Sequence, residues 1–452
     1  MHERSVAPAS SMSDADAIMW TIERDPVLRS TIVAVGVLSG RPDHDAVRRT
    51  FERAAQLLPK FGQVVRPSRF GIGRPEWVDA PAFDLDYHVR RFDAPEGADL
   101  RRVLDLVAPM AVQDFDRSRP LWEVTVVDGL AGGESVLVLK VHHTVTDGVG
   151  GIHLAELLFR ETDLAGSAPP PSSPSPSRGT SRSPTDRVVG AVTQGFRVAR
   201  DPVGTAREIA RTVTSIARMT RPVTHPLSPA FRGRGLGRRF DVLDVPLRDL
   251  AAIARANGAT VNDVFLAAAA GGLARYHDVL GAPTGALRIT VPINLRDDDS
   301  LGGNRFTPAR FVLPISDDPV ERVQIADRLV KQWRDEPAVR LTDRLASVLR
   351  LLPAPLLTAV FQSMLRNVDV DLVDVPGIRH HVSLGGVRLE RLYAFAPPTG
   401  TAVSITLLSH VDECCIGIDA DTTAVADPVL LTDCLATAFD EMRSLRRGAV
   451  TS

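Results

Sequence analysis

The sequence predicts an α/β protein, built of α+β layers and divided into two domains by a linker. At 452 residues the chain is longer than one hydrophobic core usually serves. In both halves, strand-like stretches alternate with stretches of helical periodicity. Between them, the run ETDLAGSAPPPSSPSPSRGTSRSPTDR is rich in proline and serine and cannot bury a core. We therefore expect a first domain at residues 1–160, a linker and basic segment at 161–225, and a second domain at 226–452.

The first domain is expected to contain a strand at residues 30–38 and a helix at 43–58. Apolar residues recur in that helix at helical spacing, namely Val47, Phe51, Ala54 and Leu58. Two β-rich runs at 121–130 and 134–143 are separated by the residues AGG, which favours a hairpin. A glycine-rich turn then leads into a helical pattern at 152–160.

The second domain repeats this alternation of helices and strands. A helix that ends at the pair Asn257-Gly258 is followed by a helix that Thr260 is placed to cap. Strands are expected at residues 238–247, 286–295, 309–315, 402–410 and 414–420.

The composition argues against several classes of protein. A net charge of −2 does not suit a nucleic-acid binder that works through bulk positive charge. Three cysteines imply no disulfide framework, which fits a reducing cytoplasm. The N-terminal residues lack the continuous apolar region of a secretory signal. No stretch reaches the roughly 18 to 20 apolar residues of a membrane-spanning helix.

Two segments allow both a purely structural and a functional interpretation. The apolar run LLPAPLLTAVFQSML, residues 351–365, is expected to be a buried core helix, with an interfacial lipid-contacting segment as the alternative. Residues 187–240 contain eleven arginines against Asp201 and Glu208. They predict a solvated helix face, or a surface that meets anionic lipid headgroups or the phosphates of CoA.

The most informative segment is KVHHTVTDGVGG, residues 140–151, where a histidine pair ends an apolar strand. The glycines that follow permit close approach of a substrate to the backbone. Histidine suits general-base chemistry because its ordinary pKa, about 6.5, lies near neutral pH. Adjacent residues on a strand point to opposite faces, so only one of the two histidines faces a given cavity.

Other chemistries fit this segment less well. A metal site needs several converging ligands, and the segment supplies one imidazole and one carboxylate at most. A serine hydrolase needs a nucleophile elbow, and the sequence contains no G-x-S-x-G. The second histidine pair, His380-His381, lacks the downstream Asp-Gly. A base without a protein nucleophile favours direct attack by a hydroxyl group of the substrate.

The segment HHTVTDG matches HHxxxDG, the signature of condensation-type acyltransferases that resemble chloramphenicol acetyltransferase. The rest of the chain resembles one branch of that superfamily, the wax ester synthase/diacylglycerol acyltransferases, from about residue 12 to residue 445. The segments that carry this resemblance, in the order of the family, are DLDYHV (84–89), DRSRPLWE (116–123), VNDV (261–264), VPINLR (291–296) with GN (303–304), and VDVPG (373–377) with LGG (384–386).

The resemblance implies a role for each matching residue. His143 would face a channel between two chloramphenicol-acetyltransferase-like domains and take the proton from the acceptor hydroxyl, with His142 as its structural partner. Asp147 would pair with an arginine and fix the turn, with Arg296 as the candidate partner, and Gly148 would leave room beside the base. The residues expected to shape the channel and the core between the domains are Pro120, Leu121, Trp122, Asn262 and Asp263.

The implied activity is transfer of a long-chain acyl group from acyl-CoA to diacylglycerol or a fatty alcohol, which forms triacylglycerol or wax ester. Acyl-CoA is then a substrate, and no cofactor or metal is implied. The resemblance also implies a cytoplasmic protein that associates peripherally with a membrane or lipid droplet and binds no nucleic acid. Two alternatives remain: an acyltransferase that takes its acyl group from a carrier protein, and a non-catalytic protein of lipid surfaces.

Overall fold

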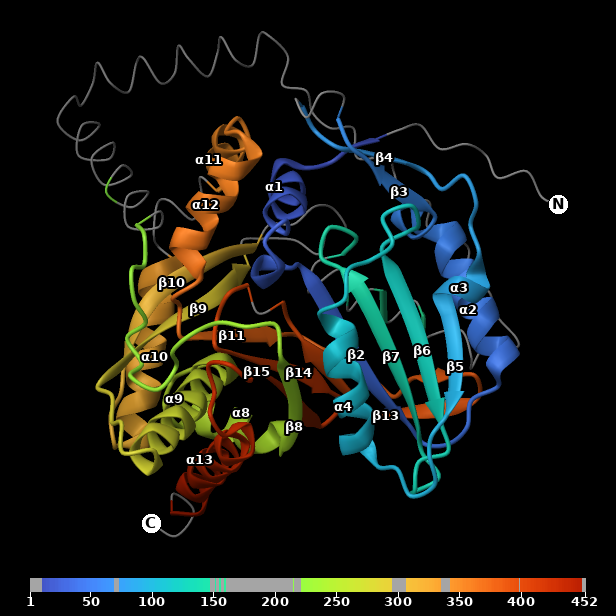
Figure 1. The fold of residues 1–452 in the computed structure, drawn as a ribbon. Helices are drawn as coiled ribbons and strands as arrows, with labels where there is room; N and C mark the ends of the chain where they lie inside the picture. The colour runs from blue at the N-terminus through green and yellow to red at the C-terminus, as the bar shows by residue number, and fades with distance from the viewer. Residues whose placement is uncertain are drawn as a thin grey trace, which may run out of the picture.

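The computed structural model describes residues 10–68, 73–146, 221–294, 306–334, 342–397 and 399–448, together with Gly151, Leu154, Ala155, Leu158, Phe159 and Thr214. In these residues, two six-stranded sheets and a three-stranded sheet form the framework (Figure 1). The mixed α/β architecture agrees with the fold class that the sequence predicts.

The first large sheet belongs mainly to the N-terminal half. Its strand order is β12 (Ser383–Leu384), β13 (Val387–Phe395), β2 (Thr31–Leu38), β7 (Ser135–His142), β6 (Trp122–Asp128) and β5 (Val89–Asp93). Helix α2 (His44–Leu57) contributes Val47, Phe51 and Ala54 to the core on one face of this sheet. Helix α4 (Leu100–Ala111) packs on the other face. The predicted hairpin is confirmed, because β6 and β7 pair as antiparallel neighbours.

A smaller sheet and short helices complete the N-terminal half. Asp43 caps α2, as its side chain accepts a hydrogen bond from the backbone N–H of Asp45 at 3.0 Å. The remaining elements are α1 (Asp14–Ile22), η1 (Pro26–Leu28), η2 (Pro59–Phe61), α3 (Leu85–His88) and the small sheet of β1 (Ser10–Ser11), β4 (Glu76–Asp79) and β3 (Gln63–Arg66).

The second large sheet lies wholly in the C-terminal half. Its strand order is β10 (Phe306–Pro314), β9 (Ala286–Asn294), β11 (Val370–Val375), β14 (Val403–His410), β15 (Glu413–Asp421) and β8 (Arg238–Pro246). The core on its outer face is shared with α8 (Leu247–Ala256), α9 (Val261–Val279), α10 (Pro319–Arg334) and α13 (Pro428–Gly448). The predicted cap of α9 is confirmed, since Thr260 and Asp263 form a capping box.

Strand β13 crosses from the C-terminal half into the first sheet, where it pairs antiparallel with β2. Its Tyr393 hydroxyl donates a hydrogen bond of 2.8 Å to Asp244 on β8, so the strand also ties the two sheets together. At Gly417 on β15, a Cβ atom would lie 2.3 Å from the carbonyl oxygen of Ala394, so only glycine allows this close approach. Strand β13 is not among the strands expected from the sequence. Apart from β12 and β13, the strands of the first large sheet lie before residue 161, and those of the second lie after residue 225.

The hairpin of α11 (Thr342–Leu349) and α12 (Ala354–Leu365) projects beside α1 (orange in Figure 1). The prediction that residues 351–365 form a buried core helix is wrong. Leu351 is 72% exposed and Leu356 is 51% exposed, whereas Leu357 packs against Ile18 of α1. One face of the hairpin is used for packing and its tip is left in solvent, which apolar composition alone does not reveal. No helix in the described part of the chain has the length and hydropathy needed to cross a membrane.

Candidate active site

The histidine pair lies where β7 ends, beside the first residue of β2. His142 is the register partner of Thr31, and its backbone N–H donates to the carbonyl of Leu121 at 3.0 Å. The backbone N–H of His143 donates to the carbonyl of Ser30 at 2.7 Å. Backbone hydrogen bonds therefore fix both histidines at one corner of the first sheet.

Both ring nitrogens of His142 are hydrogen bonded within the protein. Nδ1 accepts the backbone N–H of Thr144 at 3.1 Å and lies 2.7 Å from the hydroxyl of the same residue. The proton of the neutral ring is therefore on Nε2, which donates to Oε2 of Glu23 at 2.7 Å. Arg117 holds Glu23 from its other oxygen at 2.9 Å. His142, which is 1% exposed, thus has no ring nitrogen left for a substrate.

His143 begins the turn that follows β7, and its side chain is half-buried. The turn is closed by the backbone N–H of Val145, which donates to the carbonyl of His142 at 2.9 Å. The amino group of Lys60 donates to the carbonyl of Thr144 at 2.5 Å and ties the turn to η2. The backbone that carries His143 is therefore held from both sides, which suits a side chain that must keep a fixed position.

Three predicted site residues, Asp147, Gly148 and Arg296, lie outside the residues that the structure describes. The same holds for most of the basic segment, whose described part begins at residue 221 apart from Thr214. The pairing of Asp147 with Arg296 and the lipid-binding role of the segment therefore stay predictions.

Two adjoining clefts open near this corner. One lies between the two large sheets, with Val33, Phe395 and Ala111 on the side of the first sheet and Phe240 and Asp419 on the side of the second. The other cleft reaches the side chains of His142, Glu23 and Leu121. Arg29 and Thr31 line both clefts, so the space between the halves leads to the histidine corner.

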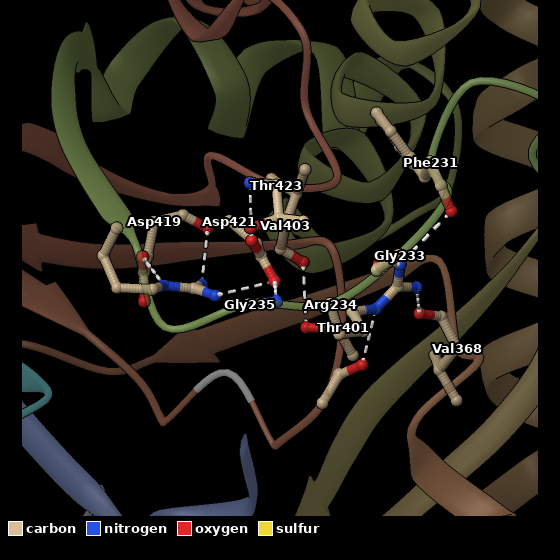
Figure 2. Close-up of polar contacts among 12 residues, drawn as sticks. Phe231, Gly233, Arg234, Gly235, Val368, Thr401, Val403, Asp419, Asp421 and Thr423 are labelled. Carbon is tan, nitrogen blue, oxygen red and sulfur yellow. Dashed lines mark hydrogen bonds and ion pairs between the residues drawn. The ribbon is translucent and has the colours of Figure 1, made fainter. Parts of the chain in front are cut away.

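The wall from the second half is fixed by a network of arginines and aspartates. Arg238 pairs with Asp419 at 2.7 Å, and Asp421 accepts the backbone N–H of Gly235 at 2.7 Å. Arg234 donates to the carbonyls of Gly400 and Val368, each at 2.8 Å (Figure 2). Burial lowers the pKa of Arg234, partly offset by nearby carboxylates. Both arginines are committed to protein acceptors and hold the segment that leads into β8 against the second sheet.

Pro120, Leu121 and Trp122 were expected to shape the channel, and the structure gives them different surroundings. Leu121 lines the cleft that reaches His142, while Pro120 is buried beside it. Trp122 is fully buried and stacks on the ring of His88, with ring centroids 4.4 Å apart. Its indole N–H donates to the carbonyl of Phe61 at 2.9 Å. Trp122 therefore fixes the core under the sheet and does not line either of these clefts.

Asn262 and Asp263 lie in the first turn of α9, distant in sequence from the histidine pair. Asp263 is buried, and its Oδ2 accepts hydrogen bonds from the backbone N–H of Thr260 at 2.8 Å and from the Thr260 hydroxyl at 2.7 Å. Burial, followed by the charge of Asp263, raises the pKa of Asp374 to about 6. The contacts of Asp263 are those of a helix cap, and Asn262 lies half-buried beside it.

The three cysteines, Cys414, Cys415 and Cys434, are buried and unpaired. Burial raises the pKa of Cys414 and of Cys415 to about 12, so almost no thiolate is present at neutral pH. The second histidine pair, His380-His381, is exposed and far along the chain from the first. Among the described residues, no three histidine, cysteine or acidic side chains gather into a metal site.

Sequence reasoning missed Glu23 and Lys60, which fix the ring of His142 and the turn after it. Glu23 is 119 residues from His142, and nothing in the spacing of the sequence pairs the two. Thr144 lies inside the motif, two residues after His142, a spacing at which a hydroxyl reaches back to a neighbouring group in a turn.

Comparison with known protein families gives matches along most of the chain. The model of the wax ester synthase/diacylglycerol acyltransferase catalytic domain matches residues 12–265. The model of the WS/DGAT C-terminal domain matches residues 302–443. The histidine pair thus lies within the region matched as catalytic.

Two proteins of Mycobacterium tuberculosis strain H37Rv, both named as diacylglycerol O-acyltransferases, are similar over nearly their whole length. One is 35% identical, over 99% of this chain and 95% of its own. The other is 29% identical, over 97% of this chain and 98% of its own.

Two solved structures share the fold. The wax ester synthase/diacylglycerol acyltransferase of Marinobacter aquaeolei VT8 has a TM-score of 0.64 at 21% identity, over 97% of this chain and all of that one. The first condensation domain of the calcium-dependent antibiotic synthetase has a TM-score of 0.63 at 18% identity, over 98% of this chain and 97% of that one. The predicted two-domain fold of the condensation type is thereby confirmed.

Proposed function

The chain belongs to the wax ester synthase/diacylglycerol acyltransferase family, and we propose that it transfers a long-chain acyl group from acyl-CoA to the hydroxyl group of diacylglycerol or a fatty alcohol. The products are triacylglycerol or wax ester. The observation that carries the proposal is the geometry around the histidine pair at the end of β7. Both ring nitrogens of His142 are hydrogen bonded within the protein, and the cleft between the halves adjoins a second cleft that reaches this pair. The family motif assigns the role of base to its second histidine, so in this proposal His143 is the base.

In the proposed reaction His143 removes the proton from the acceptor hydroxyl. The hydroxyl oxygen then attacks the thioester carbon, and the resulting tetrahedral intermediate expels the sulfur of CoA, which takes up the proton from His143. General-base assistance of this kind contributes roughly 10² to 10⁴ in rate. The hydrogen bond from the His143 backbone to Ser30 and the contact of Lys60 with the turn support the position of the base.

The acyl group passes directly between substrates, without an acyl-enzyme. The high pKa of the buried Cys414 and Cys415 makes them poor nucleophiles. His142, whose ring is bonded to Glu23 and Thr144, orients the corner instead of reacting. In this proposal Asp147 fixes the turn through Arg296 and Gly148 leaves space beside the base, as the family resemblance implies, and no cofactor takes part.

The hairpin of α11 and α12 suits a protein that works at a lipid surface. Val348, Leu351 and Leu356 are 63%, 72% and 51% exposed, and exposed aliphatic side chains of this size gathered at one tip favour contact with lipid. We therefore propose that the protein associates peripherally with a membrane or lipid droplet. The basic segment at residues 187–240 would add attraction to anionic headgroups, which salt weakens.

Flotation with lipid vesicles tests this association. The double variant Leu351→Ser, Leu356→Ser should bind less, while Val429→Ser, at a 49% exposed position on α13, serves as the matched control and should bind as the wild type does. An equal loss of vesicle binding in both variants would show that the hairpin does not contact the lipid specifically. Binding of the wild type that responds neither to anionic lipid nor to salt would remove the basic segment.

Product analysis tests the activity itself. The purified protein is incubated with a labelled long-chain acyl-CoA and, in separate reactions, with diacylglycerol, a fatty alcohol or no acceptor, and products are identified by mass spectrometry. Labelled triacylglycerol or wax ester is expected. Activity with an acyl group on a carrier protein and none with acyl-CoA would favour the carrier-dependent alternative, and no transfer with either donor would favour a non-catalytic lipid-surface protein.

A further inference from the structure

A row of polar residues crosses the middle of the second sheet. Thr290 on β9 is the register partner of Asp371 on β11, which is the partner of Ser404 on β14. Ser404 is in turn the partner of Asp419 on β15. Because register partners on neighbouring strands lie side by side about 5 Å apart, these four side chains share one face of the sheet.

That face is the one turned away from the helices of the second half. The residues that alternate with the row, among them Ile289, Val370 and Ile405, pack into the core with α8, α9 and α13. Asp419, at one end of the row, lines the cleft between the halves. Asp371, two strands further along, lies about 10 Å from Asp419 by strand spacing. The row therefore runs inward from the cleft between the halves.

The hydrogen-bonding capacity in the middle of this row is largely unused. Asp371 is 7% exposed, and the hydrogen bond that its carboxyl makes within the described residues is a long one of 3.5 Å from the Ser404 hydroxyl. Thr290 is 4% exposed, and its buried hydroxyl has no partner among the described residues. By contrast, Asp419 at the cleft is paired with Arg238 at 2.7 Å.

Burying a polar group that has no hydrogen-bond partner lowers the stability of the fold. An unsatisfied buried polar group costs about 1 to 3 kcal/mol, and valine would fill either position on a strand without that cost. Buried polar groups in native proteins almost always have a partner, in the protein, in water or in a ligand. The adjacent pair of Thr290 and Asp371 therefore points to a partner other than the residues that the structure describes.

The chemistry of the row indicates what that partner is. Burial raises the pKa of Asp371 to about 7, and the Ser404 hydrogen bond is the effect that opposes burial. The carboxyl is thus about half protonated near pH 7 and largely protonated below it, and the protonated form donates one hydrogen bond and accepts others. Arg310, the register partner of Thr290 on β10, donates to the carbonyls of Met364 and Arg221. The carboxyl and the two hydroxyl groups suit an uncharged oxygen-bearing group better than a phosphate, which arginine or lysine usually binds.

We propose that Asp371, Thr290 and Ser404 bind an ester group of diacylglycerol and so favour a glyceride over a simple fatty alcohol as acyl acceptor. This inference rests on the proposed function and specifies its acceptor. An ester carbonyl accepts hydrogen bonds from the carboxyl and from the hydroxyls, and it satisfies the buried groups that the sheet leaves unpaired. A fatty alcohol has no oxygen apart from its hydroxyl and leaves the row unsatisfied.

Kinetics with two acceptors test the proposal. The variants Thr290→Val and Asp371→Leu keep the shape of the strand and remove the polar groups. Each should raise KM for diacylglycerol about fivefold or more, the size expected for the loss of a buried hydrogen bond, while KM for a fatty alcohol and for acyl-CoA stay within about twofold. Val373→Ala, on the same face of β11, is the matched control and should affect both acceptors alike.

Three results would overturn the proposal. Equal changes in KM for both acceptors would make the row a general wall of the channel, and a change confined to acyl-CoA would assign it to the donor. If KM for both acceptors and for acyl-CoA is unchanged in the variants, the row does not bind a substrate and its partner is ordered water.

Direct binding separates this inference from the proposed function. Calorimetry with dioctanoylglycerol and with decanol does not depend on turnover. An inactive wild-type protein that binds dioctanoylglycerol, with affinity lost in Thr290→Val, would refute the proposed function and keep the polar site. If the wild type forms triacylglycerol and the Thr290→Val variant binds dioctanoylglycerol as tightly as the wild type, the polar site is refuted and the proposed function stands.

Discussion

The substitution Asp371→Asn should change how the stability of the protein depends on pH. Burial raises the pKa of the Asp371 carboxyl to about 7 in the folded protein, against about 3.9 in the unfolded chain. Because the folded pKa is raised, the stability associated with the protonated carboxyl is fully present below about pH 4 and is lost as pH rises through about 7. A difference of about three pH units corresponds to about 4 kcal/mol at most, of which about 3 kcal/mol falls between about pH 5 and about pH 8.

Asparagine keeps the shape and the hydrogen-bonding atoms of this side chain but does not ionise. Urea unfolding of the wild type and of Asp371→Asn across this range should show the variant gaining relative stability as pH rises. Buried acids elsewhere in the sheet, such as Asp369 and Asp374, titrate in both proteins and cancel in the difference. A difference in unfolding free energy that stays constant from about pH 5 to about pH 8 would show that Asp371 is already charged in the fold, and would refute the reasoning.

Three further predictions concern the active site and the core beneath it. Replacing Glu23 with Ala should lower kcat more than replacing it with Gln, because Gln can still accept the Nε2–H of His142; equal initial rates for the two variants would argue against this orienting role. The substitution Trp122→Phe should lower the unfolding free energy by about 1 to 3 kcal/mol, through the lost hydrogen bond to Phe61, and leave KM for both substrates nearly unchanged; a large change in KM would return Trp122 to the channel wall. Replacement of all three cysteines with Ala should spare turnover, and initial-rate plots should intersect; parallel lines, with an acyl group trapped on the protein, would indicate a covalent intermediate.

Local features of the fold were predictable from the sequence. The hairpin of β6 and β7 follows from two β-rich runs joined by a short glycine-containing turn, and the start of α9 follows from Thr260 and Asp263. In each case the residues that decide the structure lie within a few positions of one another. The motif at His142 and His143 belongs to the same group, since it is read directly from seven consecutive residues.

Features that depend on distant parts of the chain were not predictable in this way. Strand β13 joins the first sheet although about 350 residues separate it from its partner β2, and no periodicity encodes that choice of neighbour. The exposure of Leu351 has the same origin, because an apolar helix is buried or exposed according to what packs on it. Glu23 reaches His142 only because α1 folds back beside the end of β7.

The central claim is that His143 is the base of an acyl-CoA-dependent transfer to a lipid hydroxyl. Its most direct test compares the wild type with His143→Ala, using labelled acyl-CoA and diacylglycerol, and records the thermal melt of both proteins. The backbone hydrogen bond of residue 143 to Ser30 survives this substitution, so the melt should stay close to that of the wild type. Turnover should fall by roughly 10² to 10⁴, the contribution of a general base. A well-folded His143→Ala protein that keeps more than half of the wild-type turnover would contradict the claim.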